Sequence, residues 1–414
     1  MKSNYKKIGD NIRLVDERNT GLKVKQLLGL SISKQFIPSV ANIIGTDMEN
    51  YKIIRKNQFA CSTMQVRRDK KMPVALLNEV DKAIISAAYP VFEVTDTTEL
   101  LPEYLMMWFS RQEFDREACF YAIGGVRGSL EWEDFCEMKL PIPHPDKQKE
   151  IVKEYNIIVN RIALNNQLIQ KLEETAQAIY KQWFVDFEFP DEEGKPYKSN
   201  GGEMEMNLEL EKEIPEGWKV GQLKSICSKI GSGSTPRGGK ENYQKEGISL
   251  VRSMNVHDFI FSPEDLAYID NNQAKILEPV TLKKEDILLN ITGVSVARCC
   301  IVPEFVLPAR VNQHVMIIRA KPEYYLSHYL LCLLCYSDNK AKLLGISQAG
   351  STREAITKTE IEEFKIIRPN KTVANSFDKK VKVIINSVEK AIMQNNKLSA
   401  LKDLLLSKLA TMEN

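Results

Sequence analysis

The chain contains the stretch Gly125-Val126-Arg127-Gly128-Ser129-Leu130, followed by Lys139-Leu140-Pro141-Ile142-Pro143, and it repeats this pattern about half a chain later. The second version reads Gly350-Ser351-Thr352-Arg353-Glu354-Ala355-Ile356 and then Lys365-Ile366-Ile367-Arg368-Pro369. Arg127 and Lys139 correspond to Arg353 and Lys365 with the same offset of 226 residues, and Tyr104-Leu105 matches Tyr329-Leu330 upstream. Self-similarity at a constant offset indicates an internal duplication. A duplicated unit predicts a pseudo-two-fold molecule, which suits a partner of the same symmetry, such as duplex DNA.

Each copy leads into a long stretch with heptad periodicity. Apolar residues recur in alternating steps of three and four, which predicts two amphipathic helices. Pro145 and Asp146 mark the start of the first helix, since Asp can cap free amides, and Pro369-Asn370 precede the second. The seam of the first helix consists of Ile151, Tyr155, Ile158, Ile162, Asn165, Ile169, Leu172, Ala176, Ile179 and Trp183. The seam of the second consists of Phe377, Val381, Ile384, Val388, Ala391, Asn395, Leu398, Lys402, Leu405 and Leu409.

Neither helix can leave its apolar stripe in water. Each is about 40 residues or ~60 Å long, and each buried aliphatic or aromatic side chain contributes about 1.5–3 kcal/mol. The simplest closure is an antiparallel coiled coil within the chain, with one globule at each end. Asn165 and Asn395 fall on the seams, where a polar residue fixes the register. The positions expected to serve the seam and the docking of partner proteins are Ile158, Asn165, Leu172, Trp183, Val388, Asn395 and Leu405.

The globules themselves mix strands with short helices. Strand-like runs occupy 286–289 and 314–318 in the second globule, with a helix near 326–335. In the first globule, a strand near 88–94 and a helix near 103–110 take the corresponding places. The fold class is therefore α+β, with two tandem globules related by a pseudo-two-fold axis and separated by the two long helices. We expect globules at 1–144 and 211–369, helices at 145–188 and 370–414, and a Pro/Gly-rich linker at 189–210.

Composition restricts the class of protein. With 43% hydrophobic and 27% charged residues in 414, the chain can form more than one globular core. No run approaches the roughly 18 apolar residues of a membrane span, and the N-terminus lacks a signal-peptide core. Eight irregularly spaced cysteines indicate reduced thiols and a cytoplasmic location. The net charge of +2 is weak support for nucleic-acid binding, because local patches decide phosphate contact.

Several catalytic and metal-binding patterns fail on inspection. In the stretch 231–240, Gly239 stands where a phosphate loop needs its lysine, and Glu241 follows Lys240 where it needs a hydroxyl. Cys332 and Cys335 have a zinc-like spacing beside His328, but no second pair completes four ligands, so buried thiols are the better interpretation. Asp191 and Glu193 resemble part of a nuclease metal site but lie in the linker. The chain has four histidines and no Gly-x-Ser-x-Gly elbow, so we expect neither a catalytic residue nor a metal site.

Basic residues with polar neighbours remain as candidates for DNA contact. Arg and Lys hold phosphates, and Arg also reads guanine while Asn or Gln reads adenine. The cluster 67–71 shows no apolar periodicity and is expected to be an exposed loop. The alternative for each residue is a solvated loop with no ligand. The candidates are Arg67, Arg68, Lys70, Lys71, Arg127, Thr235, Arg237, Lys240, Arg252, Arg298 and Arg353.

These features together resemble the specificity subunit of type I restriction–modification systems, over essentially the whole chain. The resemblance rests on the order of several short motifs combined with the two long helices. They are Pro215-Glu216-Gly217-Trp218, Gly233-Ser234-Thr235-Pro236, Leu289-Asn290-Ile291-Thr292-Gly293, Asn312-Gln313-His314-Val315, Gly350-Ser351-Thr352-Arg353 and Tyr180-Lys181-Gln182-Trp183-Phe184-Val185-Asp186-Phe187. The first half lacks the Pro-x-Gly-Trp motif and a clear Thr-Gly pair, which leaves its DNA-contacting residues less defined.

The resemblance implies a division of labour. The globules 1–144 and 211–369 would be target-recognition domains that each read one half of a bipartite, asymmetric target in double-stranded DNA. The helices would space them and dock two methyltransferase subunits, which a restriction or translocase subunit joins. S-adenosylmethionine, ATP and Mg would be used by those partners, and this chain would hold no cofactor. The alternative is a non-catalytic coiled-coil scaffold that binds only proteins. A fused methyltransferase is disfavoured because no Asn-Pro-Pro-Tyr-like motif is present.

Overall fold

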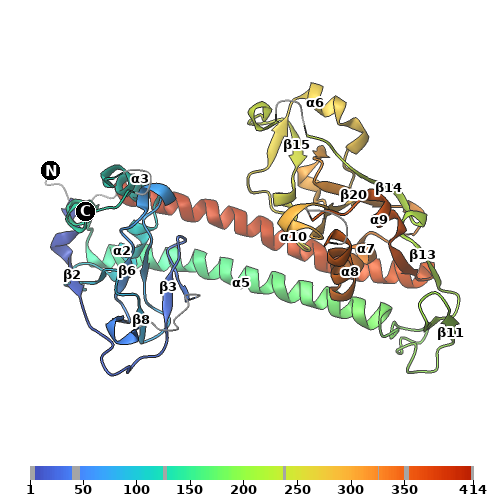
Figure 1. The fold of residues 1–414 in the computed structure, drawn as a ribbon, viewed down its shortest axis with the longest axis horizontal. Coiled ribbons are helices and arrows are strands. Elements are labelled where there is room, and N and C mark those ends of the chain that lie inside the picture. Colours follow the sequence, from blue (N-terminus) through green and yellow to red (C-terminus); the bar gives the residue numbers. More distant parts are fainter. Residues whose placement is uncertain are drawn as a thin grey trace. The chain divides into compact units, whose positions relative to one another are not determined.

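The computed structural model describes residues 5–39, 47–124, 128–235, 239–324, 326–348 and 354–411 (Figure 1). It divides into two compact units. Unit 1 comprises residues 1–164 and 395–414, and unit 2 comprises residues 165–394. The two long helices, α5 (Pro145–Phe184) and α10 (Lys371–Lys408), each contribute one part to either unit. None of the helices in the described part of the chain is long and apolar enough to span a bilayer.

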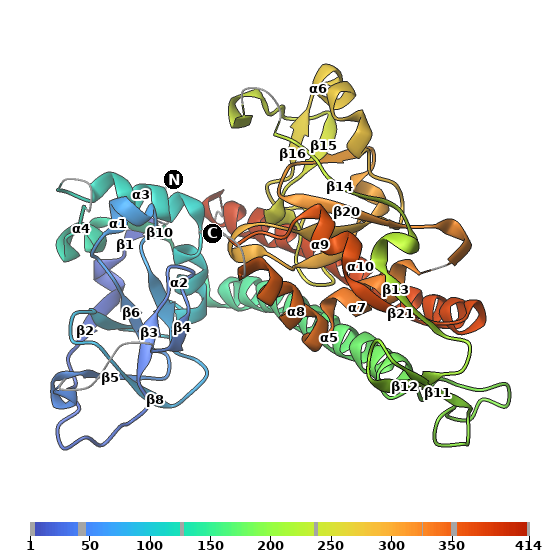
Figure 2. The ribbon, with the colours of Figure 1, turned by 45° about the vertical axis from the view of Figure 1, so that its right-hand side comes forward.

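Unit 1 contains short strands and short helices. The strands are β1 (Tyr5–Lys7), β2 (Ile12–Val15), β3 (Leu28–Leu30), β4 (Phe36–Pro38), β5 (Lys52–Arg55), β6 (Phe59–Cys61), β7 (Val74–Leu76), β8 (Lys82–Ile85), β9 (Val91–Val94) and β10 (Lys139–Pro141). The helices are α1 (Val66–Asp69), which lies between strands, and α2 (Pro102–Phe109), α3 (Gln112–Tyr121) and α4 (Trp132–Glu137). Within this unit, α1, α3 and α4 lie at one end and β5 and β8 at the other (Figures 1 and 2).

Unit 2 has a similar arrangement of strands and helices, with one additional lobe. Its strands are β11 (Met204–Asn207), β12 (Lys212–Pro215), β13 (Lys219–Gln222), β14 (Cys227–Ser232), β15 (Ile248–Val251), β16 (Ala267–Ile269), β17 (Ile287–Asn290), β18 (Cys299–Ile301), β19 (Ala309–Val311), β20 (Val315–Ala320) and β21 (Lys365–Arg368). Its helices are α6 (Asn271–Ile276), α7 (Ser327–Cys335), α8 (Ser337–Gln348) and α9 (Lys358–Glu363). Strands β15 and β16 with α6 form a lobe on the side of the sheet away from α5 (Figures 1 and 2).

The central sheets of the two units have the same strand order. In unit 1 the order is β2-β9-β6-β7, and in unit 2 it is β14-β20-β17-β18, with every neighbouring pair antiparallel. A smaller pair closes each unit, β1 with β10 and β13 with β21. Because β10 and β21 are the repeated Lys139 and Lys365 stretches, the structure confirms both the duplication and the α+β class predicted from the sequence.

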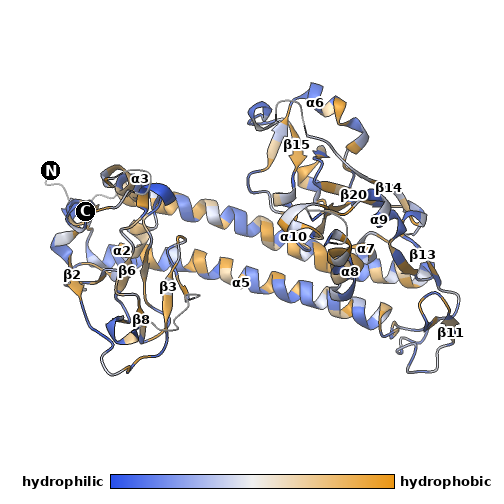
Figure 3. Ribbon diagram, viewed as in Figure 1, coloured by the Kyte–Doolittle hydropathy of each residue, from blue (hydrophilic) through white to orange (hydrophobic). Residues whose placement is uncertain are grey.

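The inner strands of each central sheet, β6 with β9 and β17 with β20, are largely buried on both faces, so they are mostly apolar and their side chains alternate between two cores. The edge strands β2 and β14 have exposed residues. On β17, Ile287 and Leu289 face the core formed with α7 and the long helices, whereas Leu288 faces the core formed with β15 and β16. The neighbouring Cys299 and Cys300 alternate in the same way. The central strands are correspondingly hydrophobic in Figure 3. All eight cysteines are free, and burial raises the pKa of the Cys61 thiol.

Within each unit, α5 and α10 pack against one another. In unit 1, Tyr155 of α5 and Leu405 and Leu406 of α10 belong to one core. In unit 2, Asn165 donates a hydrogen bond of 3.0 Å to Gln394, and the rings of Trp183 and Phe377 lie 5.6 Å apart. Residue numbers therefore rise along α5 as they fall along α10, so the helices pair antiparallel as predicted. None of the twenty heptad positions is exposed.

The helix ends differ in detail from the prediction. Pro145 is the first residue of α5, but Asp146 does not cap the helix. It lies in the first turn, where its carboxylate pairs with Lys149 at 3.3 Å, and the carbonyl of His144 accepts the first amides, those of Lys147 and Gln148. The helix ends at Phe184, before the expected residue 188, and Phe187 takes a left-handed φ of 62°. Residues 409–411 after α10 form a 3-10 turn.

The predicted linker is ordered by aromatic packing. Phe187 and Phe189 are buried against Trp218, with ring centroids 5.8 and 5.1 Å away, and β11 pairs with β12 as a hairpin. The carboxylate of Asp191 accepts the backbone amides of Glu193 and Lys195 at 2.9 and 2.8 Å. Asp191 therefore organises a turn, which explains its position without a metal.

The repeated tyrosines make equivalent hydrogen bonds. Tyr104 donates to the carbonyl of Pro141 at 3.1 Å, and Tyr329 donates to the carbonyl of Ile367. Both rings are almost fully buried. We expect Tyr104→Phe and Tyr329→Phe each to lower the free energy of unfolding by about 1–2 kcal/mol, because a buried carbonyl loses its donor. Chemical denaturation measures this, with Tyr121→Phe at the half-exposed Tyr121 as the control. A loss in only one variant would show that the two bonds are not equivalent.

Candidate nucleic-acid interface

Three loops of unit 2 meet beside the central sheet, and they carry most of the second-half motifs. The first loop follows β17, the second precedes β20, and the third follows β14. The amide of Ile291 donates to the carbonyl of His314 at 3.0 Å, and the amide of Gly233 donates to the carbonyl of Asn312 at 3.1 Å. Motifs that are far apart in the sequence therefore form one surface.

Side chains on this surface form a chain of hydrogen bonds. Thr235 bonds the carbonyl oxygen of the Gln313 side chain, and the Gln313 amide contacts Nε2 of His314 at 2.9 Å. The other ring nitrogen of His314 lies 2.6 Å from the hydroxyl of Thr292. Since the Gln313 amide donates, Nε2 of His314 accepts and Nδ1 carries the proton. With this tautomer the Thr292 oxygen accepts, and among the described residues its own hydrogen has no acceptor.

Two glycines allow this close approach of loops. A Cβ on Gly233 would lie 1.7 Å from the carbonyl oxygen of Val311, so only glycine fits there. Gly293 adopts φ of 72°, and its amide donates to the carbonyl of Glu354 at 3.0 Å. The next residue, Val294, is 99% exposed. The tight turn at Gly293 thus places an apolar side chain fully in solvent beside the polar chain.

Arg252 and Arg298 are the basic candidates of unit 2 whose side chains the structure describes, and both make contacts within the protein. Arg252 follows β15; it donates to the carbonyl of Asp265 and lies over the ring of Tyr243 at 5.5 Å. Arg298 is half-buried, and its guanidinium lies 3.4 Å from Nδ1 of His257. The buried Asn290 connects their loops by donating to the carbonyls of Ser253 and Val256. Arg252 and Arg298 therefore flank the surface with part of their hydrogen-bonding capacity already used.

The basic cluster of unit 1 occupies the equivalent position in its own sheet. It follows β6, which has the place of β17 in the shared strand order. The amide of Leu130 donates to the carbonyl of Thr63 at 2.9 Å, just as the amide of Ile356 donates to the carbonyl of Ile291 at 2.8 Å. Gln65 has φ of 63°, close to the 72° of Gly293. Thr63 thus corresponds to Ile291, and Met64 and Gln65 stand in the place of the Thr292-Gly293 motif that the first half lacks.

The cluster itself is a helical turn, where an irregular loop was expected. The α1 turn forms because Val66 is fully buried and the amide of Asp69 donates to the carbonyl of Gln65 at 3.0 Å. The Arg68 guanidinium bonds Asp69 at 2.7 Å and holds the pKa of that carboxyl below its usual range. The four basic side chains, Arg67, Arg68, Lys70 and Lys71, are all exposed.

Exposed apolar side chains lie beside this cluster. Phe120 and Ile123, at the end of α3, are 80% and 69% exposed. The thiol of Cys119 contacts the carbonyl of Val66 at 3.4 Å, which joins α3 to α1. Phe120, Ile123 and Val294 were not among the predicted contacts, because the exposure of an apolar residue leaves no periodic signal in so short a loop. Gln313, His314 and Thr292 lie in the quoted motifs but were not among the predicted contacts either.

Some predicted contacts lie outside the described residues. These are Arg127, Arg237 and Arg353, together with the side chain of Lys240.

The residues of the zinc-like pattern make other contacts within the fold. Nδ1 of His328 forms a hydrogen bond of 2.8 Å with the carboxylate of Asp378. Cys332 is fully buried in an apolar core. Cys335 points to the carbonyl of Cys299 at 3.5 Å. In the described ranges, no three or more His, Cys, Asp or Glu side chains are grouped in a way that could hold a metal ion.

Comparison with known proteins identifies the family. The family model described as the type I restriction modification DNA specificity domain matches residues 41–174 and 215–403, one match for each half of the duplication. The chain belongs to this family, and the resemblance to specificity subunits is confirmed.

Individual relatives agree with the family assignment. The type I restriction enzyme MjaIX specificity subunit of Methanocaldococcus jannaschii is 26% identical over 312 residues, covering 75% of this chain and 68% of the relative. The HindI specificity subunit of Haemophilus influenzae is 21% identical, covering 89% of each chain. Among solved structures, the S subunit of a type I restriction–modification system from M. genitalium superposes with a TM-score of 0.59 at 14% identity, covering 99% of this chain and 96% of that one. That similarity concerns the fold.

Proposed function

We propose that this chain reads a bipartite, asymmetric sequence in double-stranded DNA, with one half-site for each unit. The proposal rests on one observation: the loops that follow β6 and β17 differ in their residues, although the two strands hold the same place in sheets of the same strand order. The loop after β6 presents Arg67, Arg68, Lys70 and Lys71, whereas the loop after β17 presents Thr292 and Val294 beside Gln313. Identical half-sites would need nearly identical loops, so the two halves of the target should differ.

The chemistry of both surfaces suits duplex DNA. Exposed Arg and Lys neutralise phosphates and position the protein, while Gln, Thr and Arg hydrogen-bond to base edges. Exposed apolar side chains such as Phe120 and Val294 can contact a thymine methyl group or enter a base step. A scaffold that binds only proteins would not need this combination in two copies.

We propose that partner subunits dock on the outer surfaces of the long helices. The seam positions Ile158, Asn165, Trp183 and Val388 are buried, and Leu172, Asn395 and Leu405 are half-buried, so they support helix pairing. Neighbouring apolar residues are exposed instead. In unit 1 these are Ile157, Leu164, Leu401 and Leu404, and in unit 2 they are Leu168, Val383 and Met393. Exposed apolar residues of this kind mark protein interfaces.

The proposed partners are two methyltransferase subunits and a restriction or translocase subunit. S-adenosylmethionine, ATP and Mg belong to those partners in this proposal, and the chain itself takes no cofactor. Equilibrium binding of labelled S-adenosylmethionine to the isolated chain and to the assembled complex tests the assignment. Binding to the complex alone supports it, and binding to the isolated chain contradicts it.

Methylome sequencing of host cells with and without the gene tests the reading of a split target. We expect gene-dependent methylation in a motif of two unlike half-sites separated by a nonspecific spacer. Replacing residues 211–369 by the corresponding domain of a relative should change one half-site and leave the other unchanged. A single continuous motif would contradict the proposal, and the absence of any gene-dependent methylation or DNA binding would favour the protein scaffold.

A further inference from the structure

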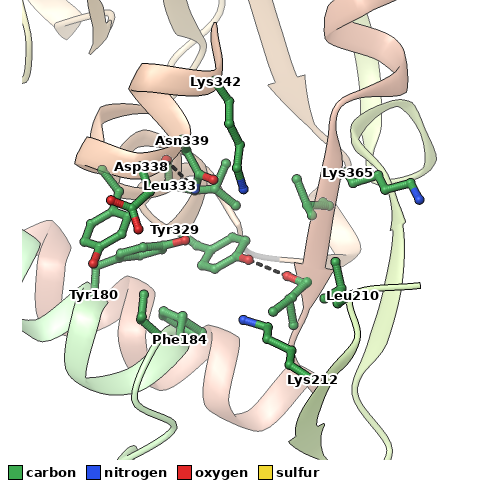
Figure 4. Close-up of a pocket in the computed structure, with 14 residues that line it drawn as sticks. Tyr180, Phe184, Leu210, Lys212, Tyr329, Leu333, Asp338, Asn339, Lys342 and Lys365 are labelled. Atoms are coloured by element: carbon green, nitrogen blue, oxygen red, sulfur yellow. Dashed lines mark hydrogen bonds between the residues drawn. The ribbon is translucent and has the colours of Figure 1, made fainter. Parts of the chain in front are cut away.

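Unit 2 contains a cavity that is separate from the loops described above. It has a volume of about 270 Å³ and lies between the C-terminal turn of α5, the strand β12, the helices α7 and α8, and the strand β21. Its apolar wall is largely aromatic, with Tyr180, Phe184, Tyr329 and Leu333 (Figure 4). An aromatic wall of this size suits a flat group such as a single ring.

Two lysines point into this cavity from opposite sides, Lys212 from β12 and Lys342 from α8 (Figure 4). Within the residues that the structure describes, neither ammonium group has an ion-pair partner, although that of Lys212 lies 5.2 Å from the centre of the Phe187 ring. The third lysine on the rim, Lys365, points away from the cavity and pairs with Glu209 at 3.3 Å. The cavity wall thus carries two ammonium groups and one carboxylate, that of Asp338, which pairs with neither lysine in the described residues.

The other polar groups on the cavity wall are engaged by the protein. Tyr329 donates to the carbonyl of Ile367, and Asn339 donates to the carbonyl of Leu333 at 3.1 Å. Asp338 accepts from the hydroxyl of Ser337 at 3.1 Å. Because the Asp338 carboxylate repels an anion, Lys212 and Lys342 are the cavity cations that remain available to hold one.

The electrostatic situation of Lys212 favours an anion. Lys212 and Lys342 are both exposed, but partial desolvation of the Lys212 ammonium lowers its pKa, and the charges of Lys342 and Lys198 lower it further. Like charges that face one another across a cavity repel, and a bound anion between them removes this cost. A carboxylate or phosphate held by two ammonium groups also gains charge-assisted hydrogen bonds.

We propose that this cavity binds a small aromatic oxyanion, with the carboxylate or phosphate between Lys212 and Lys342 and the ring against Tyr180 and Tyr329. The cavity volume is slightly below that of common ligand pockets, which limits the occupant to about one ring. Such a ligand would bind against the α5–α10 core of unit 2 and stabilise that unit.

Thermal unfolding of the full-length chain with benzoate and phenyl phosphate tests the site. Benzamide, a neutral molecule of similar shape, and sodium chloride at matched ionic strength are the ligand controls. We expect both anions to raise Tm saturably, whereas benzamide and chloride do not. The K212Q and K342Q variants should each weaken the response at least tenfold, because each loses one charge-assisted bond.

The matched control variant is K365Q, in which the lysine that points away is changed. It should keep the wild-type response. A second readout is the pKa of Lys212 by NMR, which should rise in K342Q without ligand because the facing charge is gone. The proposal is overturned if neither anion gives a saturable shift, if benzamide matches benzoate, or if K365Q weakens the response as much as K212Q does.

Discussion

Replacing Arg67, Arg68, Lys70 and Lys71 together by Ala is expected to weaken DNA binding by the assembled complex about a thousandfold in 0.1 M salt. Each phosphate contact contributes roughly 0.9 to the slope of log affinity against log salt, so four contacts account for about three to four units. The side chains are exposed on one turn, and Val66 holds the backbone of that turn in place. The substitution should therefore remove charge without unfolding the unit. Fluorescence anisotropy at a series of salt concentrations measures both quantities.

A matched control changes four exposed lysines at the other end of the same unit. Lys23, Lys25, Lys56 and Lys82 lie near β5 and β8 or in the loop before β3, away from α1. Their replacement by Ala lowers the net charge equally but should leave the salt slope nearly unchanged. If the two quadruple variants lose affinity and slope to the same degree, the effect reflects general charge, and the α1 cluster is not a specific contact surface. An unchanged slope in the α1 variant would remove the cluster from the interface.

The largest expected effect on stability comes from Phe377→Ala. Phe377 on α10 is fully buried, with ring centroids 4.8 Å from Phe184, 5.6 Å from Trp183 and 6.4 Å from Tyr180. Truncation removes the transfer energy of the ring and leaves a cavity among large side chains that cannot collapse easily. We expect a loss of about 3–5 kcal/mol in the free energy of unfolding of unit 2.

Denaturant unfolding followed by tryptophan fluorescence measures this loss. Trp183 and Trp218 report on unit 2, while Trp108 and Trp132 lie in unit 1. Val383→Ala on the same helix is the control, because Val383 is 65% exposed and its change should stay within about 0.5 kcal/mol. A loss of less than about 1 kcal/mol for Phe377→Ala would show that the aromatic group is not the main contact between α10 and the core.

The duplication and the pairing of the two long helices could both be inferred from sequence patterns. A heptad pattern is a local signal, and a stripe of apolar residues can be buried in few ways. The seam positions of the two helices, from Ile151 to Leu409, were therefore assigned correctly to the buried side of the helix pair. The repeated Tyr104 and Tyr329 also signalled a shared framework, which the equivalent hydrogen bonds explain.

Tertiary structure alone decided which loops meet. The contact of Thr292 with His314 and the contact of Thr235 with Gln313 depend on the order of strands in the sheet, and strand order arises from nonlocal pairing that short motifs do not encode. For the same reason, the sequence could not show that Met64 and Gln65 stand in the place of the Thr-Gly motif. It also could not show that the guanidinium of Arg252 already donates a hydrogen bond to the carbonyl of Asp265. Lys212 and Lys342 are likewise far apart in the sequence, and only the fold brings them to one cavity, which β12 and α8 both line.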